Sequence, residues 1–198
     1  MIREQNFSKG PIFGPLVRFA LPILLALFLQ TMYGAVDMMV VGQFATAADV
    51  TAVSTASWLM QLVTSLVVGI AVSTTVLLGR KLGEGNAAES GKIVGASIAL
   101  FGFLGIALTV AMELLAVPLV KLMQTPPEAV GAAVAYMRIC SAGTVFIVAY
   151  NVLGSVFRGI GNSRIPLMAV AFACVFNIAG DYLLVGVFKM AAAGAAIA

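Results

Sequence analysis

The sequence predicts an all-α integral membrane protein, a bundle of five complete transmembrane helices followed by the start of a sixth. Hydrophobic residues make up 62% of the chain and charged residues only 10%, and the mean hydropathy is +1.09. Soluble domains carry about 25% charged residues. The apolar residues also fall into runs of about 20 or more, which is the length that an α-helix needs to cross a bilayer.

Five apolar runs are long enough to span a membrane, and clusters of glycine, proline and polar residues separate them. Their expected bounds are 16–41, 53–78, 93–123, 130–156 and 165–187, and a sixth helix is expected from about residue 191. Asn86 and Glu89 resemble a capping box, which predicts that the third helix begins near them. Gly159-Ile160-Gly161 is interpreted as a turn, because a phosphate-binding loop would need a preceding strand.

The composition also limits the kinds of chemistry to expect. The chain has no histidine, which removes His-based metal sites and His general bases. Cys140 and Cys174 lie in apolar runs and are expected to be free thiols. We predict neither an enzyme nor a cofactor, and the net charge of +3 gives no reason to expect nucleic acid as a partner. No cleavable signal peptide is evident, so the first apolar run is expected to stay in the protein.

Most lysine and arginine residues lie on one side of the predicted helix bundle. Eight of them lie on the N-terminal flank and in the loops after the second and fourth helices: Arg3, Lys9, Arg18, Arg80, Lys81, Lys92, Arg158 and Arg164. Lys121 and Lys189 lie on the other side, and Arg138 lies inside the fourth helix. By the positive-inside rule, the N-terminus is expected in the cytoplasm, in a multi-pass protein of the inner (plasma) membrane.

Two aspartates lie inside expected spans. At 1.5 Å per residue, Asp37 is roughly 27 Å along its helix from Phe19, and Asp181 is roughly 24 Å from Ile165, so both sit at similar depth in the outer part of the bilayer. A charged side chain there costs a few kcal/mol on insertion scales. Such a residue normally faces the protein interior and marks a functional site.

Helical spacing groups other residues with these acids. One stripe of the first helix at i, i+3, i+4 and i+7 holds Gln30, Tyr33, Gly34 and Asp37. Asn177 and Asp181 share a face of the fifth helix, and Gly34 and Gly180 allow another helix to approach closely.

The residues leave three interpretations of the acids open. Asp37 and Asp181 can exchange a proton, or, with the amide oxygen of Asn177, they can offer hard oxygen ligands to a sodium ion. Alternatively, each aspartate forms a permanent, purely structural ion pair with an arginine, and Arg138 is the obvious candidate. Pro22 is either an ordinary membrane-helix proline or a kink that lets the outer half of the first helix bend separately.

In its motifs the chain resembles the prokaryotic multidrug and toxic compound extrusion (MATE) transporters. The matching features are Pro22, Gln30, Tyr33, Asp37 and Gly42; the loop Gly79-Arg-Lys-Leu-Gly-Glu-Gly-Asn86; the segment from Tyr150-Asn151 to Pro166; and Asn177-Ile-Ala-Gly-Asp-Tyr-Leu-Leu184. No single one of these features is decisive, but their order and spacing, taken together, are specific to this family.

The resemblance implies a twelve-helix secondary antiporter with two six-helix lobes around a central cavity. Such proteins export cationic or amphipathic compounds in exchange for sodium ions or protons, without a cofactor. The resemblance assigns Asp37, Asn177 and Asp181 to the cation or proton site, and Gln30, Tyr33 and Asn151 to the substrate cavity. Residues 1–198 then form the N-terminal transmembrane lobe. The C-terminal lobe is missing, so we expect either a piece of a longer protein or a half-transporter that assembles with another lobe.

Three other functions remain as alternatives. A lipid-linked oligosaccharide flippase shares the architecture, but its cavity needs several cationic side chains. An intramembrane aspartyl protease also uses two membrane aspartates, yet its Tyr-Asp and Gly-x-Gly-Asp signatures are absent here. A structural membrane subunit would tolerate asparagine at both aspartates. The sequence leaves the substrate and the choice between sodium and proton open.

Overall fold

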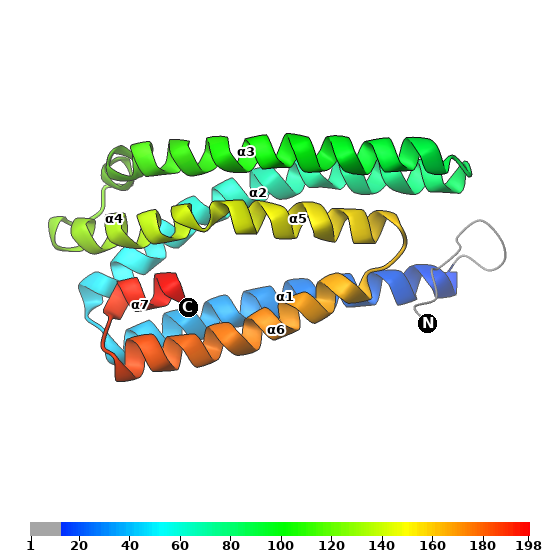
Figure 1. Cartoon of the computed structure of the whole chain (residues 1–198). Helices are drawn as coiled ribbons and strands as arrows, with labels where there is room; N and C mark the ends of the chain where they lie inside the picture. Colours follow the sequence, from blue (N-terminus) through cyan, green and yellow to red (C-terminus); the bar gives the residue numbers. More distant parts are fainter. Residues whose placement is uncertain (1–12) are drawn as a thin grey trace.

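The computed structural model describes residues 13–198, and nearly all of them are helical, which confirms the all-α prediction (Figure 1). The elements are α1 Phe13–Phe44, α2 Ala47–Gly83, α3 Ala87–Leu122, α4 Pro127–Ala142, α5 Thr144–Gly159, α6 Arg164–Asp181, the π-helix η1 Tyr182–Val187, and α7 Ala191–Ile197.

Four continuous helical segments are long and apolar enough to cross a membrane, namely α1, α2, α3 and the joined α6 and η1. A fifth span exists only if α4 and α5, which meet at a bend of 48°, are counted together. The sequence predicts one helix over 130–156, whereas the structure has two helices separated at Gly143. The count of five complete spans therefore depends on treating this bent pair as one.

The helices form two groups (Figure 1). Helices α2, α3, α4 and α5 pack on one another, and α1 packs along α6. The short α7 lies between the groups and contacts α4 and η1. The α2–α3 and α5–α6 connections lie at the same end of the bundle as the start of α1. We call this the basic end, and the other the opposite end.

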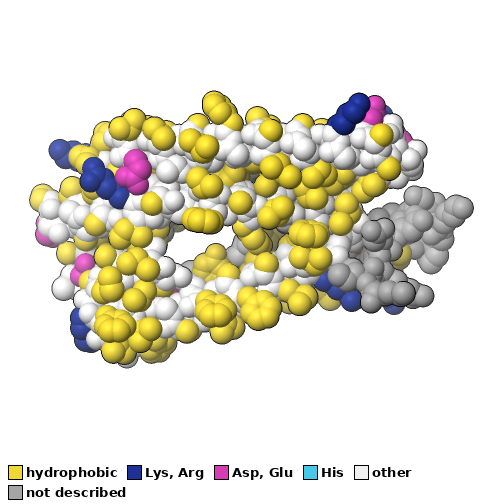
Figure 2. Space-filling view, viewed as in Figure 1, with side chains coloured by type: hydrophobic (Ala, Val, Ile, Leu, Met, Phe, Trp, Pro, Cys, Tyr) yellow, Lys and Arg dark blue, Asp and Glu magenta, His cyan; other side chains and the backbone are white. Residues whose placement is uncertain are grey.

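Small residues let the helices approach closely at the opposite end. The main buried cluster there contains Ala52, Ala56, Ala116, Ala129 and Ala133, with Val41 and Val53 beside them. In lipid, helix association depends on such close packing, because the surrounding chains are as apolar as leucine. Large hydrophobic side chains cover the exterior instead, as Figure 2 shows for one face.

Polar caps end the helices where the sequence leaves the apolar runs. Thr46 and Asp49 form a capping box at the start of α2. The side chain of Asn86 accepts from the backbone N–H of Glu89 at 3.1 Å, so α3 begins where the sequence predicts. Gly85 and Gly161 adopt φ values of 73° and 81°, a conformation that glycine tolerates without strain.

Ion pairs concentrate in the α2–α3 connection. Glu84 pairs with Arg80 at 2.9 Å and with Lys81 at 3.0 Å, and Lys81 also reaches Glu89 at 2.7 Å. The hydrogen bonds from Lys81 and Arg80 lower the pKa of Glu84. Arg18, Lys92, Arg158 and Arg164 lie toward the same end, while Arg3 and Lys9 lie outside the described residues.

Helices α2 and α5 are in close contact near the basic end. A Cβ added at Gly159 would lie 3.0 Å from Cβ and from Cδ2 of Leu78, and the Thr75 hydroxyl donates to the Ser155 carbonyl at 2.9 Å. We therefore expect Gly159→Val to lower the free energy of unfolding by about 1–3 kcal/mol through overpacking. Thermal unfolding in detergent measures this.

Gly102→Val is the matched control, because a Cβ at Gly102 would meet nothing within 4 Å. Equal losses in the two variants would show that the close contact with Leu78 does not matter.

Candidate cation and substrate site

Buried oxygen atoms without a hydrogen-bond partner gather on three residues. In the described part of the chain, five side-chain atoms are buried and unpartnered: Asp37 Oδ1, Asn177 Oδ1, both carboxyl oxygens of Asp181, and Thr109 Oγ1. Buried polar groups are normally paired, and each unpaired one costs about 1–3 kcal/mol. Four of the five belong to the residues that the resemblance assigns to the cation site.

The packing of α1 on α6 brings these residues to one region. Asp37 lies on α1, about two turns before its end at Phe44. Asn177 and Asp181 lie one turn apart on α6, and Asp181 is completely buried. The carboxyl groups of Asp37 and Asp181 are close enough to interact electrostatically. Two acidic groups, whose charges would repel each other, thus lie in the same region of the lobe.

A π-helical turn follows Asp181 directly. The six residues of η1, Tyr182–Val187, continue α6 with wider turns. Such π segments are rare and occur frequently at functional sites. No motif in the sequence predicted this one.

Two residues of helix α4 lie within electrostatic reach of Asp37. Tyr136 and Cys140 lie one turn apart, and both interact electrostatically with the Asp37 carboxyl group. The Ser57 hydroxyl of α2 donates to the Tyr136 hydroxyl at 3.2 Å. Asp37 therefore faces the interior of the lobe. Sequence analysis missed Tyr136, because its only signal is an i, i+4 spacing to Cys140.

The aspartates have no arginine partner among residues 13–198. The guanidinium of Arg138 lies 3.9 Å from Glu113 of α3, and both side chains are partly exposed. Neither Asp37 nor Asp181 takes part in an ion pair in this region. Arg138 therefore does not hold these aspartates in a static pair.

The oxygen atoms suit a sodium ion or a proton. Carboxylate and amide oxygens are the hard ligands that such a cation prefers. Within the described residues, no cluster of three or more His, Cys, Asp or Glu side chains exists. The arrangement thus offers two carboxyl groups and one amide. Binding a cation or a proton there would compensate the buried charge.

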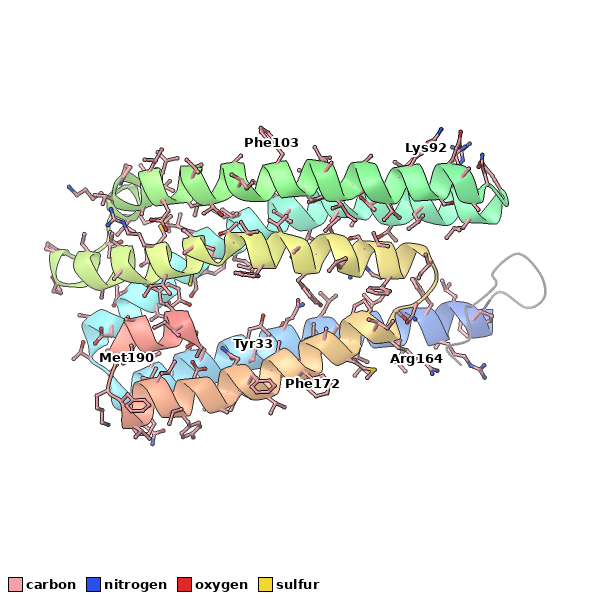
Figure 3. The ribbon with its side chains drawn as sticks, in the orientation of Figure 1. Tyr33, Lys92, Phe103, Arg164, Phe172 and Met190 are labelled. Atoms are coloured by element: carbon pink, nitrogen blue, oxygen red, sulfur yellow. The ribbon has the colours of Figure 1, made fainter. Side chains whose placement is uncertain are left out.

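A second polar group lies nearer to the basic end. The Tyr150 hydroxyl lies within electrostatic reach of Gln30 and Tyr33. Tyr33, labelled in Figure 3, lies on α1 between the two helix groups. Figure 2 shows an opening between these groups. Asn151 is buried on α5, and its amide donates to the Ile147 carbonyl at 2.8 Å.

Pro22 is buried inside α1, fifteen residues before Asp37. Since proline has no N–H, the Arg18 carbonyl lacks its usual helical donor. The helix nevertheless continues without interruption to Phe44.

The family model named MatE matches residues 22–183, which is most of the chain. This chain belongs to the MATE family. Among curated proteins, the probable multidrug resistance protein YpnP of Bacillus subtilis (strain 168) is 29% identical over 195 residues, covering 98% of this chain and 44% of YpnP.

Solved MATE structures in a bent and a straight conformation match with TM-scores of 0.86 and 0.85. Both are 25% identical, and the alignment covers 92% of this chain and 40% of each solved chain. The chain thus spans less than half the length of these MATE relatives. Its fold corresponds to their N-terminal half.

The unpaired carboxyl groups of this MATE chain should lower its stability. We expect Asp181→Asn to raise the free energy of unfolding by about 1–3 kcal/mol in sodium-free buffer at pH 8, because it removes a buried charge that faces another. Thermal unfolding in detergent measures the change.

Glu113→Gln is the control, since exposed ion pairs contribute about 0–1 kcal/mol. If Asp181→Asn destabilises the protein more than this control does, the aspartate has a partner that stabilises it.

Proposed function

We propose that this chain is the N-terminal lobe of a secondary active antiporter that exports cationic or amphipathic compounds in exchange for sodium ions or protons. The observation that carries the proposal is the set of buried, unpartnered oxygens on Asp37, Asn177 and Asp181. A protein gains nothing in stability from such a set. A binding site for an exchangeable cation explains why it is there.

The family supports export of drugs. MATE relatives are named as multidrug resistance and multidrug export proteins. The chain covers 44% of YpnP, so the second lobe and the cavity between lobes would come from residues beyond these 198. The lobe would lie in the plasma membrane with its basic end in the cytoplasm, because lysine and arginine favour that side.

Coupling follows from competition between two charge states of the aspartates. With Asp37 and Asp181 neutralised, their repulsion is removed and α1 can pack against α6 at little cost. With both ionised, the lobe favours an arrangement in which they are separated or bound to a cationic substrate. Ion and substrate then stabilise different states, which is the condition for exchange.

Pro22 supplies the place where α1 can bend. The missing hydrogen bond to Arg18 weakens the helix at that turn. Solved MATE relatives exist in a bent and a straight conformation. In this chain, bending at Pro22 would carry Asp37, together with Gln30 and Tyr33, relative to α6.

The substrate would occupy the space beside these residues. Gln30 and Tyr33 on α1, together with Asn151 on α5, would line it. Tyr150 joins this set, because it is a residue of α5 within electrostatic reach of Gln30 and Tyr33.

Removing the Asp37 charge should break the exchange. In cells that express the complete gene, we expect Asp37→Asn to lower ion-dependent dye efflux at least about tenfold, since coupling energies of 1–3 kcal/mol correspond to factors of about 5–150. Glu113→Gln is the control, because that carboxylate pairs with Arg138 away from the site. Undiminished efflux that still depends on the ion would contradict the role of Asp37.

The coupling ion can be identified by one efflux series on the same protein. Efflux is measured at fixed pH with and without sodium, and then across pH without sodium. If the aspartates bind sodium, we expect sodium to accelerate efflux at constant pH. If the aspartates exchange protons, an inward proton gradient should drive efflux without sodium. Efflux that responds to neither ion would contradict antiport.

A further inference from the structure

The ring of Phe44, the last residue of α1, lies against the segment that follows Asp181. A Cβ added at Gly186 would lie 3.6 Å from Cε2 of this ring, so the ring packs directly on the glycine. The ring of Tyr182 meets it edge-on, with the centroids 6.2 Å apart and the planes at 70°. Nζ of Lys189 lies over the ring, 5.0 Å from its centroid. We call these four residues, Phe44, Tyr182, Gly186 and Lys189, the Phe44 cluster.

The loop that carries Lys189 has a costly backbone conformation. Lys189 and Ala191 have φ values of 57° and 49°, in the left-handed region that residues with a Cβ rarely adopt. The backbone N–H of Met190, between them, donates to the Leu184 carbonyl at 2.9 Å, which ties the loop to η1. Such strained residues persist only where their surroundings hold them, and they gather at segments that switch between conformations. Here the strain accompanies the placement of the Lys189 ammonium over the Phe44 ring.

The Phe44 cluster joins the two helices that carry the aspartates, at the opposite end of the bundle (Figure 1). Phe44 is seven residues after Asp37, which places both on one face of α1, roughly 10 Å apart along the helix. Tyr182 follows Asp181 directly. Pro22 lies 22 residues before Phe44, roughly 33 Å away along the helix. Bending at Pro22 therefore moves the end of α1 farther than any part of the helix between them, and the cluster holds that end.

We propose that Phe44 is a positioning residue of the cation site. The Phe44 cluster holds α1 against η1, which keeps Asp37 beside Asp181, and the cluster comes apart when α1 bends at Pro22. Its role in exchange rests on the proposed function, to which it adds the contact that holds one of the two states. When the ring leaves Gly186, the Lys189 loop loses the contact that accompanies its strain and relaxes.

Distances between spin labels on α1 and α6 test this proposal. The labels are attached through Met39→Cys and Phe176→Cys, because these side chains are 72% and 73% exposed and lie outside the core. The protein is made from the complete gene with its native cysteines replaced by alanine, and double electron–electron resonance is recorded in dodecyl maltoside. We expect Phe44→Ala to raise the ratio of longer to shorter distances at least about tenfold, since burial of a phenylalanine ring contributes that factor or more.

Two further substitutions disturb the cluster and leave the ring in place. Lys189→Gln should raise the same ratio about two- to fivefold, the factor that an exposed cation–π contact contributes, and Lys189→Arg should restore it. Gly186→Leu should push the ring away and act like Phe44→Ala. Gly186→Ala is its matched control, because a Cβ there meets the ring at an ordinary van der Waals distance.

Two substitutions of phenylalanine in α1 complete the controls. Phe44→Tyr keeps the ring and should give the distances of the unsubstituted protein. Phe28→Ala removes a ring that is 60% exposed on the same helix and should leave the distances unchanged. Thermal unfolding of each variant is recorded beside the distances, because a residue that only stabilises the fold would change the unfolding temperature and not the distances.

Unchanged distances in Phe44→Ala and Gly186→Leu would overturn the proposal, whatever happens to the unfolding temperature. An equal shift in Phe28→Ala, or no rescue by Phe44→Tyr, would overturn it as well. If Phe44→Ala does not fold, Lys189→Gln and Gly186→Leu decide by the same criterion. The proposed function is tested separately: the expected distance shifts together with ion-independent efflux would contradict antiport and leave the assignment of Phe44 intact.

Discussion

The buried repulsion between Asp37 and Asp181 is the constraint on which the rest of the lobe depends. A bilayer offers no water to solvate these charges, and residues 13–198 supply no arginine or lysine to pair with them. The protein must therefore surround them with its own groups. It does so with α1, α4 and α6, which bring Tyr136, Cys140 and Asn177 to the same region. Leaving these groups unpaired costs stability, and the proposed exchange of a cation would account for that cost.

The remaining architecture keeps this region closed. Alanine and valine on the buried faces of α2, α3 and α4 let those helices pack tightly near the site. Larger apolar side chains point outward to the lipid. The cluster at the opposite end thus packs beside the charged groups, and the opening in Figure 2 lies between α5 and the pair formed by α1 and α6.

Much of the fold follows from local sequence, because span length and caps are local properties. The apolar runs, the Asn86 cap and the Gly159–Gly161 turn are visible in the residues, and the free state of Cys140 and Cys174 agrees with their surroundings. The stripe of Gln30, Tyr33 and Asp37 follows from helical periodicity alone.

Other features depend on contacts between distant segments. The bend at Gly143 divides a run that is continuously apolar, so hydropathy cannot detect it. Tyr136 lies within electrostatic reach of Asp37, and Tyr150 within electrostatic reach of Tyr33, although each pair comes from helices far apart in sequence. The sequence places Arg158 in a loop, whereas it lies inside α5 and its guanidinium donates to the Ser155 hydroxyl. Residue type does not show whether a long side chain turns outward or back along its helix. The sequence indicates that the aspartates face the protein interior, but it does not indicate which residues of other helices lie around them.

The wide turn after Asp181 has a geometric effect on the face that Asn177 begins. In an α-helix, residues four apart drift by about 40° around the axis. A π turn holds about 4.4 residues, which reverses this drift. Val185, which is fully buried, is thereby returned to the line of Asn177 and Asp181. Beyond the carboxyl groups this face therefore continues as a buried hydrocarbon side chain, which offers no oxygen ligand to an ion and closes the polar stretch on that side.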